Sequence, residues 1–188
     1  MINRLALAIV LGAIAGPAFA ADTYIIDPAH APAQFDIARV GFSSQRGSFK
    51  KTTGKVTLDL VNKTGSVDFT VQTNSVDMGS TAWTVHLSDE ALFNVKKFPT
   101  MNFKSDKLIF EGERVIAAEG NFTMLGVTKP LTVKVTGFQC GVSPVDKRKL
   151  CSGNISASLK RSDFGLTRYI PVVSDEVVVT VPVDAYKN

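Results

Sequence analysis

The sequence predicts an all-β, antiparallel fold with one short helix. Short segments in which apolar and polar residues alternate recur along the chain, and polar turns separate them, as expected for strands with one buried face. Helical and strand segments do not alternate, so parallel βαβ units are not expected. The strand period breaks for long enough to form a helix in only one place. A sandwich and a closed barrel both fit this pattern, although a barrel leaves no open edges and the helix would cap one mouth.

The first twenty residues are predicted to form a secretory signal peptide. Arg4 precedes an apolar run over residues 5–14, and an A-x-A cleavage site ends at Ala20, the usual order of such a leader. A membrane anchor is the alternative, but the run is too short to span a bilayer comfortably. Residues 21–188 then form one exported domain that is large enough for a substantial core. The net charge of the whole chain is only +4 and its basic residues are scattered, so no nucleic-acid partner is expected.

The expected strands follow in chain order. The first covers residues 23–27, and prolines at 28 and 32 separate it from a second strand at 33–40, which is followed by a polar turn at 41–47. Two alternating runs at 56–60 and 67–71, with a turn at 62–65, predict a hairpin. The remaining strands are expected at residues 101–103, 108–110, 115–119, 121–124, 131–136, 155–160 and 177–183, with a loop at 125–130 and Pro182 at an edge or strand end.

The helix is expected to begin at Ser88, within the stretch that also holds the single tryptophan, Trp83. Ser88 can cap the free N–H groups of the first turn, and Asp89 and Glu90 suit the positive end of the helix dipole. Apolar residues then recur at roughly helical spacing until a proline ends the segment: Ala91, Leu92, Val95, Phe98 and Pro99.

Cys140 and Cys151, the only cysteines, predict one structural disulfide. They flank a polar turn that contains the basic residues 147–149. Closing such a loop stabilises a fold by on the order of 3 kcal/mol. The C-x-x-C spacing of a redox site is absent.

The sequence offers no clear catalytic or metal site. His30 and His86 are the only histidines, no G-x-S-x-G motif is present, and no third metal ligand lies at a telling spacing. No phosphate loop or dinucleotide fingerprint occurs either. We therefore predict a protein that is not an enzyme and has no metal and no cofactor. An enzyme that uses His30 or His86 on a bound lipid is kept as an alternative.

The abundance of phenylalanine, 12 residues in the whole chain, leaves two interpretations of the interior. The aromatic side chains either fill an ordinary core or line a space that is left open for a ligand. Small inward residues such as Ala157 would help to leave it open, and composition alone does not decide between the two.

Eight short segments of the chain form a recognisable series. They are 24–30 (YIIDPAH), 47–49 (GSF), 54–56 (GKV), 86–88 (HLS), 93–103 (FNVKKFPTMNF), 120–130 (GNFTMLGVTKP), 161–165 (RSDFG) and 173–177 (VSDEV). Each segment alone is weak, but their order and spacing across residues 21–188 are specific. Together they resemble the YceI-like family of periplasmic lipid- or polyisoprenoid-binding proteins.

The resemblance implies a lipocalin-like antiparallel β-barrel with a long apolar cavity. It implies binding, without reaction, of a polyisoprenoid, a quinone-like molecule or a fatty-chain lipid for transport, storage or sequestration. It also implies a periplasmic location, with secretion as the second choice, a homodimer and transient contact with a membrane. Thr84 and Val85 stand where the family often has an Arg-Asp pair, and Ala31 stands where it often has Ser, so a head-group site that used those polar groups would be altered.

The expected binding residues follow from this picture. The chain of the ligand would contact apolar side chains and Trp83 would lie near the mouth: Phe35, Leu92, Phe93, Phe98, Phe103, Phe122 and Phe164. His30 and His86 would meet the head group, and Phe98→Asp would abolish uptake. Arg161 and Asp163 would either meet the head group or hold loops in place, and the second role is favoured. The alternative function is a structural or interaction protein with a filled barrel core, whose basic 147–149 loop or strand edge meets a partner.

Overall fold

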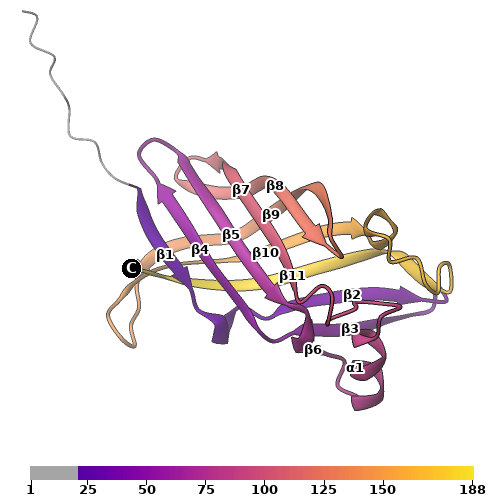
Figure 1. Ribbon diagram of the computed structural model, residues 1–188. Helices are drawn as coiled ribbons and strands as arrows, with labels where there is room; N and C mark the ends of the chain where they lie inside the picture. The colour runs from indigo at the N-terminus through magenta and orange to yellow at the C-terminus, as the bar shows by residue number, and fades with distance from the viewer. Residues whose placement is uncertain (1–20) are drawn as a thin grey trace, which may run out of the picture.

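A computed structural model describes residues 21–188, so the predicted signal peptide lies outside the described residues. Eight antiparallel strands form a closed barrel, in the order β1-β4-β5-β7-β8-β9-β10-β11, and pairing of β11 with β1 closes it (Figure 1). These strands are β1 Asp22–Ile26, β4 Thr52–Asp59, β5 Thr64–Gln72, β7 Thr100–Glu111, β8 Arg114–Met124, β9 Val127–Val142, β10 Lys149–Lys160 and β11 Val173–Lys187. The predicted all-β barrel is confirmed. Within residues 21–188, no helix is both long and apolar enough to cross a bilayer.

Three further strands extend the sheet beyond the closed barrel. They are β2 Ala33–Arg39, β3 Ser43–Phe49 and β6 Val76–Asp77, and they project together at one end (Figure 1). The long strand β11 pairs with β1 near its C-terminal end and with β2 near its N-terminal end. A short 3-10 helix, η1 Pro28–His30, separates β1 from β2. Pro182, expected at an edge or strand end, lies inside β11. It falls where β11 passes from one partner to the other, so no ladder on that side needs its missing N–H.

The single helix, α1, covers Thr81–Ser88 and therefore ends where the sequence predicted it to begin. Ser88 is not an N-cap, because its hydroxyl donates to the carbonyl of Thr84 one turn earlier, at 2.8 Å. Residues 89–98 form successive turns, and Asn94 has a positive φ of 43°. The helix expected to begin at Ser88 is therefore absent, and the turns bury both Leu92 and Phe93.

Residues 41–47, expected as a turn, lie mostly in strand β3. Its polar side chains are compatible with a strand because this extension of the sheet is largely exposed. The loop expected at 125–130 is a two-residue turn at Leu125 and Gly126, both with positive φ, as a type I′ hairpin requires. Pro130 lies within β9 and faces Asn121.

Two strands are longer than predicted. The alternation of polarity suggested breaks within β7 and β8, but both strands continue, and a bulge interrupts their register between Lys104 and Lys107. Ser105 occupies this bulge, and its hydroxyl donates to the carbonyl of Glu119 at 2.7 Å. A bulge shifts the side-chain alternation by one residue without ending the strand.

The predicted hairpin and disulfide are both confirmed. β4 and β5 pair in continuous register from Thr52 opposite Val71 to Asp59 opposite Thr64. Cys140 in β9 lies directly opposite Cys151 in β10, and the two are bonded. This pair joins the β9–β10 hairpin at the end of β10 that is remote from Lys160.

Candidate functional site

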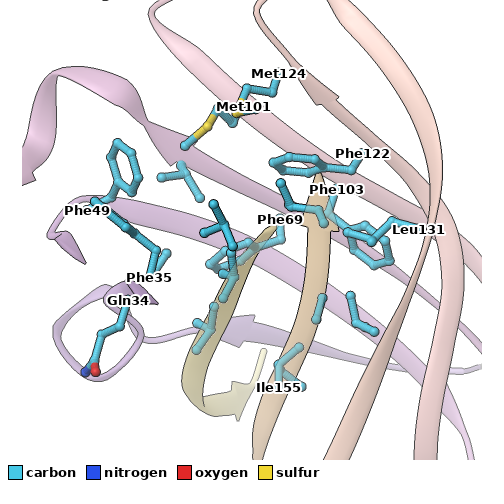
Figure 2. Close-up of a pocket in the computed structure, with 18 of the residues that line it drawn as sticks. Gln34, Phe35, Phe49, Phe69, Met101, Phe103, Phe122, Met124, Leu131 and Ile155 are labelled. Atoms are coloured by element: carbon cyan, nitrogen blue, oxygen red, sulfur yellow. The ribbon is translucent and has the colours of Figure 1, made fainter. Parts of the chain in front are cut away.

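The barrel encloses a continuous apolar cavity of about 330 Å³. Inward side chains from different strands point into one space, and nearly all of them are hydrocarbon or thioether groups (Figure 2). Residues that Figure 2 labels on this surface are the polar Gln34 and the apolar Phe35, Phe49, Phe69, Met101, Phe103, Phe122, Met124, Leu131 and Ile155. The interior is therefore hollow rather than filled.

Aromatic rings make up much of the wall, and they contact one another in pairs. Phe35 and Phe49 have ring centroids 5.7 Å apart, and Phe49 meets Phe93 edge-on at 5.2 Å. Such pairs add about 0.5–1.5 kcal/mol each beyond the area that they bury. The wall is therefore held in shape by its own contacts, independently of any ligand.

Glycine and alanine keep room for these rings. A Cβ at Gly47 would come within 2.3 Å of the Phe35 ring and 2.4 Å of the sulfur of Met78, so the Phe35 ring lies against bare backbone. Ala157 in β10 lines the cavity, as its inward position predicts. A larger side chain at either place would compete for the same space.

The mouth of the cavity lies between α1, β2 and the segment 165–173. A second hollow of about 410 Å³ is lined by side chains that also border the main cavity, together with Ala82 and Val172: Arg39, Trp83, His86, Tyr169 and Val173. The Tyr169 hydroxyl and Nε2 of His86 form a hydrogen bond of 3.1 Å. The Trp83 and His86 rings meet edge-on with centroids 6.1 Å apart. The helix thus supplies one side of the opening.

Arg161 fixes the segment beside this mouth. Its side chain is only 4% exposed. The guanidinium donates to the carbonyls of Ser174 at 2.7 Å and Val173 at 2.9 Å, and to those of Leu166 at 3.1 Å and Arg168 at 2.7 Å. Burial lowers the pKa of Arg161, against a smaller opposite effect of Asp175. Four of the five N–H groups of the guanidinium are bonded to these carbonyls. They tie the loop together, which is the role that the sequence favoured.

Comparison with known proteins places this geometry in a family. The model of the YceI-like domain matches residues 24–185. The chain belongs to the YceI-like family. UPF0312 proteins are full-length relatives: that of Yersinia pestis (strain Pestoides F) is 35% identical over 98% of this chain and 97% of its own, and that of Pseudomonas aeruginosa (strain LESB58) is 34% identical over the whole of both.

Solved structures share the YceI-like fold at lower identity. BcnA from Burkholderia cenocepacia is 22% identical with a TM-score of 0.69, covering 85% of this chain and 98% of its own. A polyisoprenoid binding domain from Saccharophagus degradans is 14% identical with a TM-score of 0.61, covering 88% and 98%. At these identities the likeness concerns the fold.

Most of the side chains predicted to bind a ligand line the YceI-like cavity. These are Phe35, Trp83, Leu92, Phe93, Phe103, Phe122 and His86. The structure does not bring Phe98, Phe164 or His30 to the cavity surface. Phe164 lies behind the lining, edge-on to Phe122 at 5.5 Å, whereas Phe98 contacts the β8–β9 turn at Gly126. The prediction that Phe98→Asp abolishes uptake through loss of a lining ring therefore has no geometric basis.

His30 lies on η1 at the surface and bonds through Nδ1 to the carboxylate of Asp27 at 2.8 Å. This hydrogen bond raises the pKa of His30 and lowers that of Asp27. Within residues 21–188, no contact joins His30 to His86, and no group of three His, Cys, Asp or Glu residues could hold a metal ion. Asp163 is exposed and is not part of the lining.

Sequence reasoning missed several lining residues of this YceI-like barrel. Phe69 shares the inward alternation of Val67 and Val71, so the strand period alone could have identified it. Arg39 and Tyr169 are different, because they meet at the mouth from segments more than a hundred residues apart. Only the pairing of β2 with β11 brings them together.

Proposed function

We propose that this protein binds a long-chain amphiphile, its hydrocarbon chain within the barrel and its polar end at the mouth. The hollow apolar cavity is the observation that carries the proposal. Left empty, about 330 Å³ costs roughly 8 kcal/mol relative to a filled core, at about 24 cal/mol per Å³. Ten buried methylenes would contribute about 8 kcal/mol before ordering costs, which is enough for micromolar binding or better.

The class of ligand is a polyisoprenoid, a quinone-like molecule or a fatty-chain lipid. The family membership and the fold shared with a polyisoprenoid binding domain support this choice. Binding is proposed to occur without reaction, since the cavity lining offers hydrocarbon and no paired acid and base. We propose transport, storage or sequestration in the periplasm, and the disulfide supports an oxidising compartment of this kind.

Transient contact with a membrane belongs to the same proposal. Apolar side chains around the mouth face solvent, with Phe42 at the β2–β3 tip 95% exposed and Trp83 51% exposed. Val40 and Val172 are also exposed, and the backbone N–H of Val40 donates to the carbonyl of Val172, so the tip adjoins the mouth. A lipid entering or leaving the barrel would cross this surface. The expected homodimer remains a prediction.

The proposal is tested by native mass spectrometry of protein purified from the periplasm of an expression host, followed by solvent extraction of the released species. We expect a stoichiometric long-chain adduct. Ala157→Phe should fill the cavity and remove the adduct, whereas Ser156→Phe, one residue along β10 and outside the lining, should retain it. A bare mass for the unaltered protein after incubation with isoprenoids, quinones and fatty acids would contradict the proposal.

A further inference from the structure

The charged side chains that line the cavity and its mouth are both arginines. They are Arg39 and Arg161. No Asp, Glu or Lys from residues 21–188 contributes to these surfaces. A ligand with a negatively charged end is attracted to a surface of this sign, whereas an uncharged chain is not.

The two arginines are in different situations. All four carbonyl partners of Arg161 belong to the protein's own backbone, so that guanidinium is already engaged. The guanidinium of Arg39 forms no ion pair or hydrogen bond with any of residues 21–188. The nearest outward carboxylate on the same strand, Asp36, is bonded to Arg46 at 2.9 Å. Arg39 therefore has its donors free for a ligand.

Arg39 lies at the boundary between the apolar cavity and the mouth. It is the last residue of β2 and pairs with Val173 of β11 and Ser43 of β3, so its backbone is fixed on both sides. It borders both the apolar cavity and the mouth hollow. Its side chain therefore lies where the hydrocarbon of a bound amphiphile would end and its head group would begin.

We propose that the mouth recognises an anionic head group, a carboxylate or a phosphate monoester, with Arg39 as its principal partner. The hydroxyl of Tyr169 and the ring of His86, already bonded to each other, supply further hydrogen-bonding groups beside it. Arginine suits this role because its planar fork donates two parallel hydrogen bonds to either anion. The inference rests on the proposed function and narrows its ligand to the acidic members of each lipid class.

The test compares matched pairs of ligands on delipidated protein. Geranylgeranyl phosphate is paired with geranylgeraniol, and palmitate with palmitamide, and each competes with a neutral fluorescent probe in the cavity. We expect the unaltered protein to bind the anionic member roughly 10- to 100-fold more tightly, the range typical of charge-assisted hydrogen bonds. Arg39→Gln should abolish this preference, so that the anionic and neutral members of each pair compete equally, and its circular dichroism spectrum should match that of the unaltered protein. Arg46→Gln, an exposed arginine bonded to Asp36, should retain it.

The outcomes separate the inference from the proposal beneath it. Equal affinity for the anionic and neutral members in the unaltered protein overturns the anionic site and leaves the lipid-binding function standing. A preference that survives Arg39→Gln overturns the assignment to Arg39. Failure of every ligand and of the probe to bind overturns the proposed function itself. Retained binding of the neutral member by Arg39→Gln shows that this variant is folded.

Discussion

Replacement of Arg161 by alanine should lower the free energy of unfolding by about 4 kcal/mol. Arg161 makes four hydrogen bonds from a charged donor to backbone carbonyls and is 4% exposed. At about 1.5 kcal/mol each these bonds would sum to about 6 kcal/mol. Some of the carbonyls can turn to water after the substitution, because the segment that carries Arg168 is at the surface, so we expect about 3–5 kcal/mol.

Urea denaturation of delipidated protein, followed by circular dichroism, measures this loss. Arg161→Lys should be intermediate, since a single ammonium group has three donors and cannot reach four carbonyls at once. Arg114→Ala is the matched control: Arg114 bonds Glu111 at 3.0 Å on the exposed surface, and we expect a loss below about 1 kcal/mol. If Arg161→Ala cost no more than Arg114→Ala, the idea that Arg161 holds the mouth segment in place would be refuted.

Three further predictions concern other parts of the molecule. Replacing Cys140 and Cys151 together by serine should lower the free energy of unfolding by about 2–3 kcal/mol, and an equal urea midpoint would contradict this. The hydrogen bond between His30 and Asp27 raises the pKa of His30 above 6.5 and lowers the pKa of Asp27 below 3.8. The pair therefore stabilises the fold between pH 3.8 and 6.5, and this effect is lost as pH rises through the pKa of His30 in the folded protein or falls through that of Asp27. NMR titration should show the pKa of His30 returning toward 6.5 in Asp27→Asn. Phe42→Ser should reduce cosedimentation with phosphatidylglycerol-containing vesicles, since Phe42 is 95% exposed beside the mouth, and unchanged binding would remove this side chain from the proposed contact.

The fold class was predictable because the alternation of polarity is a local signal. Each residue of a strand lies on one face, so Val67, Phe69 and Val71 identify the buried face of β5 before any pairing is known. The disulfide was predictable for a similar reason, since two cysteines near in sequence on either side of a turn face each other across a hairpin.

The position of the helix was not predictable from the same kind of signal. Residues 89–98 have apolar residues at roughly helical spacing, but the segment forms turns, and Leu92 and Phe93 are both buried. The helix α1, residues 81–88, has no buried side chain. Its sequence therefore lacks the apolar face from which a helix could be predicted. In residues 89–98, tertiary burial overrides local propensity.

The candidate site likewise has a part that the sequence could predict and a part that it could not. Inward phenylalanines such as Phe103 and Phe122 could be predicted as lining because their strand positions fix their direction. The mouth could not, because Arg39 and Tyr169 come together only when β11 pairs with β2. The prediction that His30 meets the head group has no geometric basis. His30 lies in a recognisable segment, but its ring is at the surface and is bonded there to the carboxylate of Asp27.

A hollow interior and a stable fold make opposing demands on this chain. An empty cavity costing roughly 8 kcal/mol is comparable with the whole stability of a typical domain, about 5–15 kcal/mol. Two fixed interactions lie at opposite ends of β10: the hydrogen bonds of Arg161 stabilise the mouth, and the Cys140–Cys151 bond closes the β9–β10 hairpin at the other end. A bound ligand adds to this, by about 2.7 kcal/mol at a hundred times its Kd. Occupancy of the barrel therefore becomes part of its stability, and the ends must be firm enough to hold the empty form together until a ligand enters.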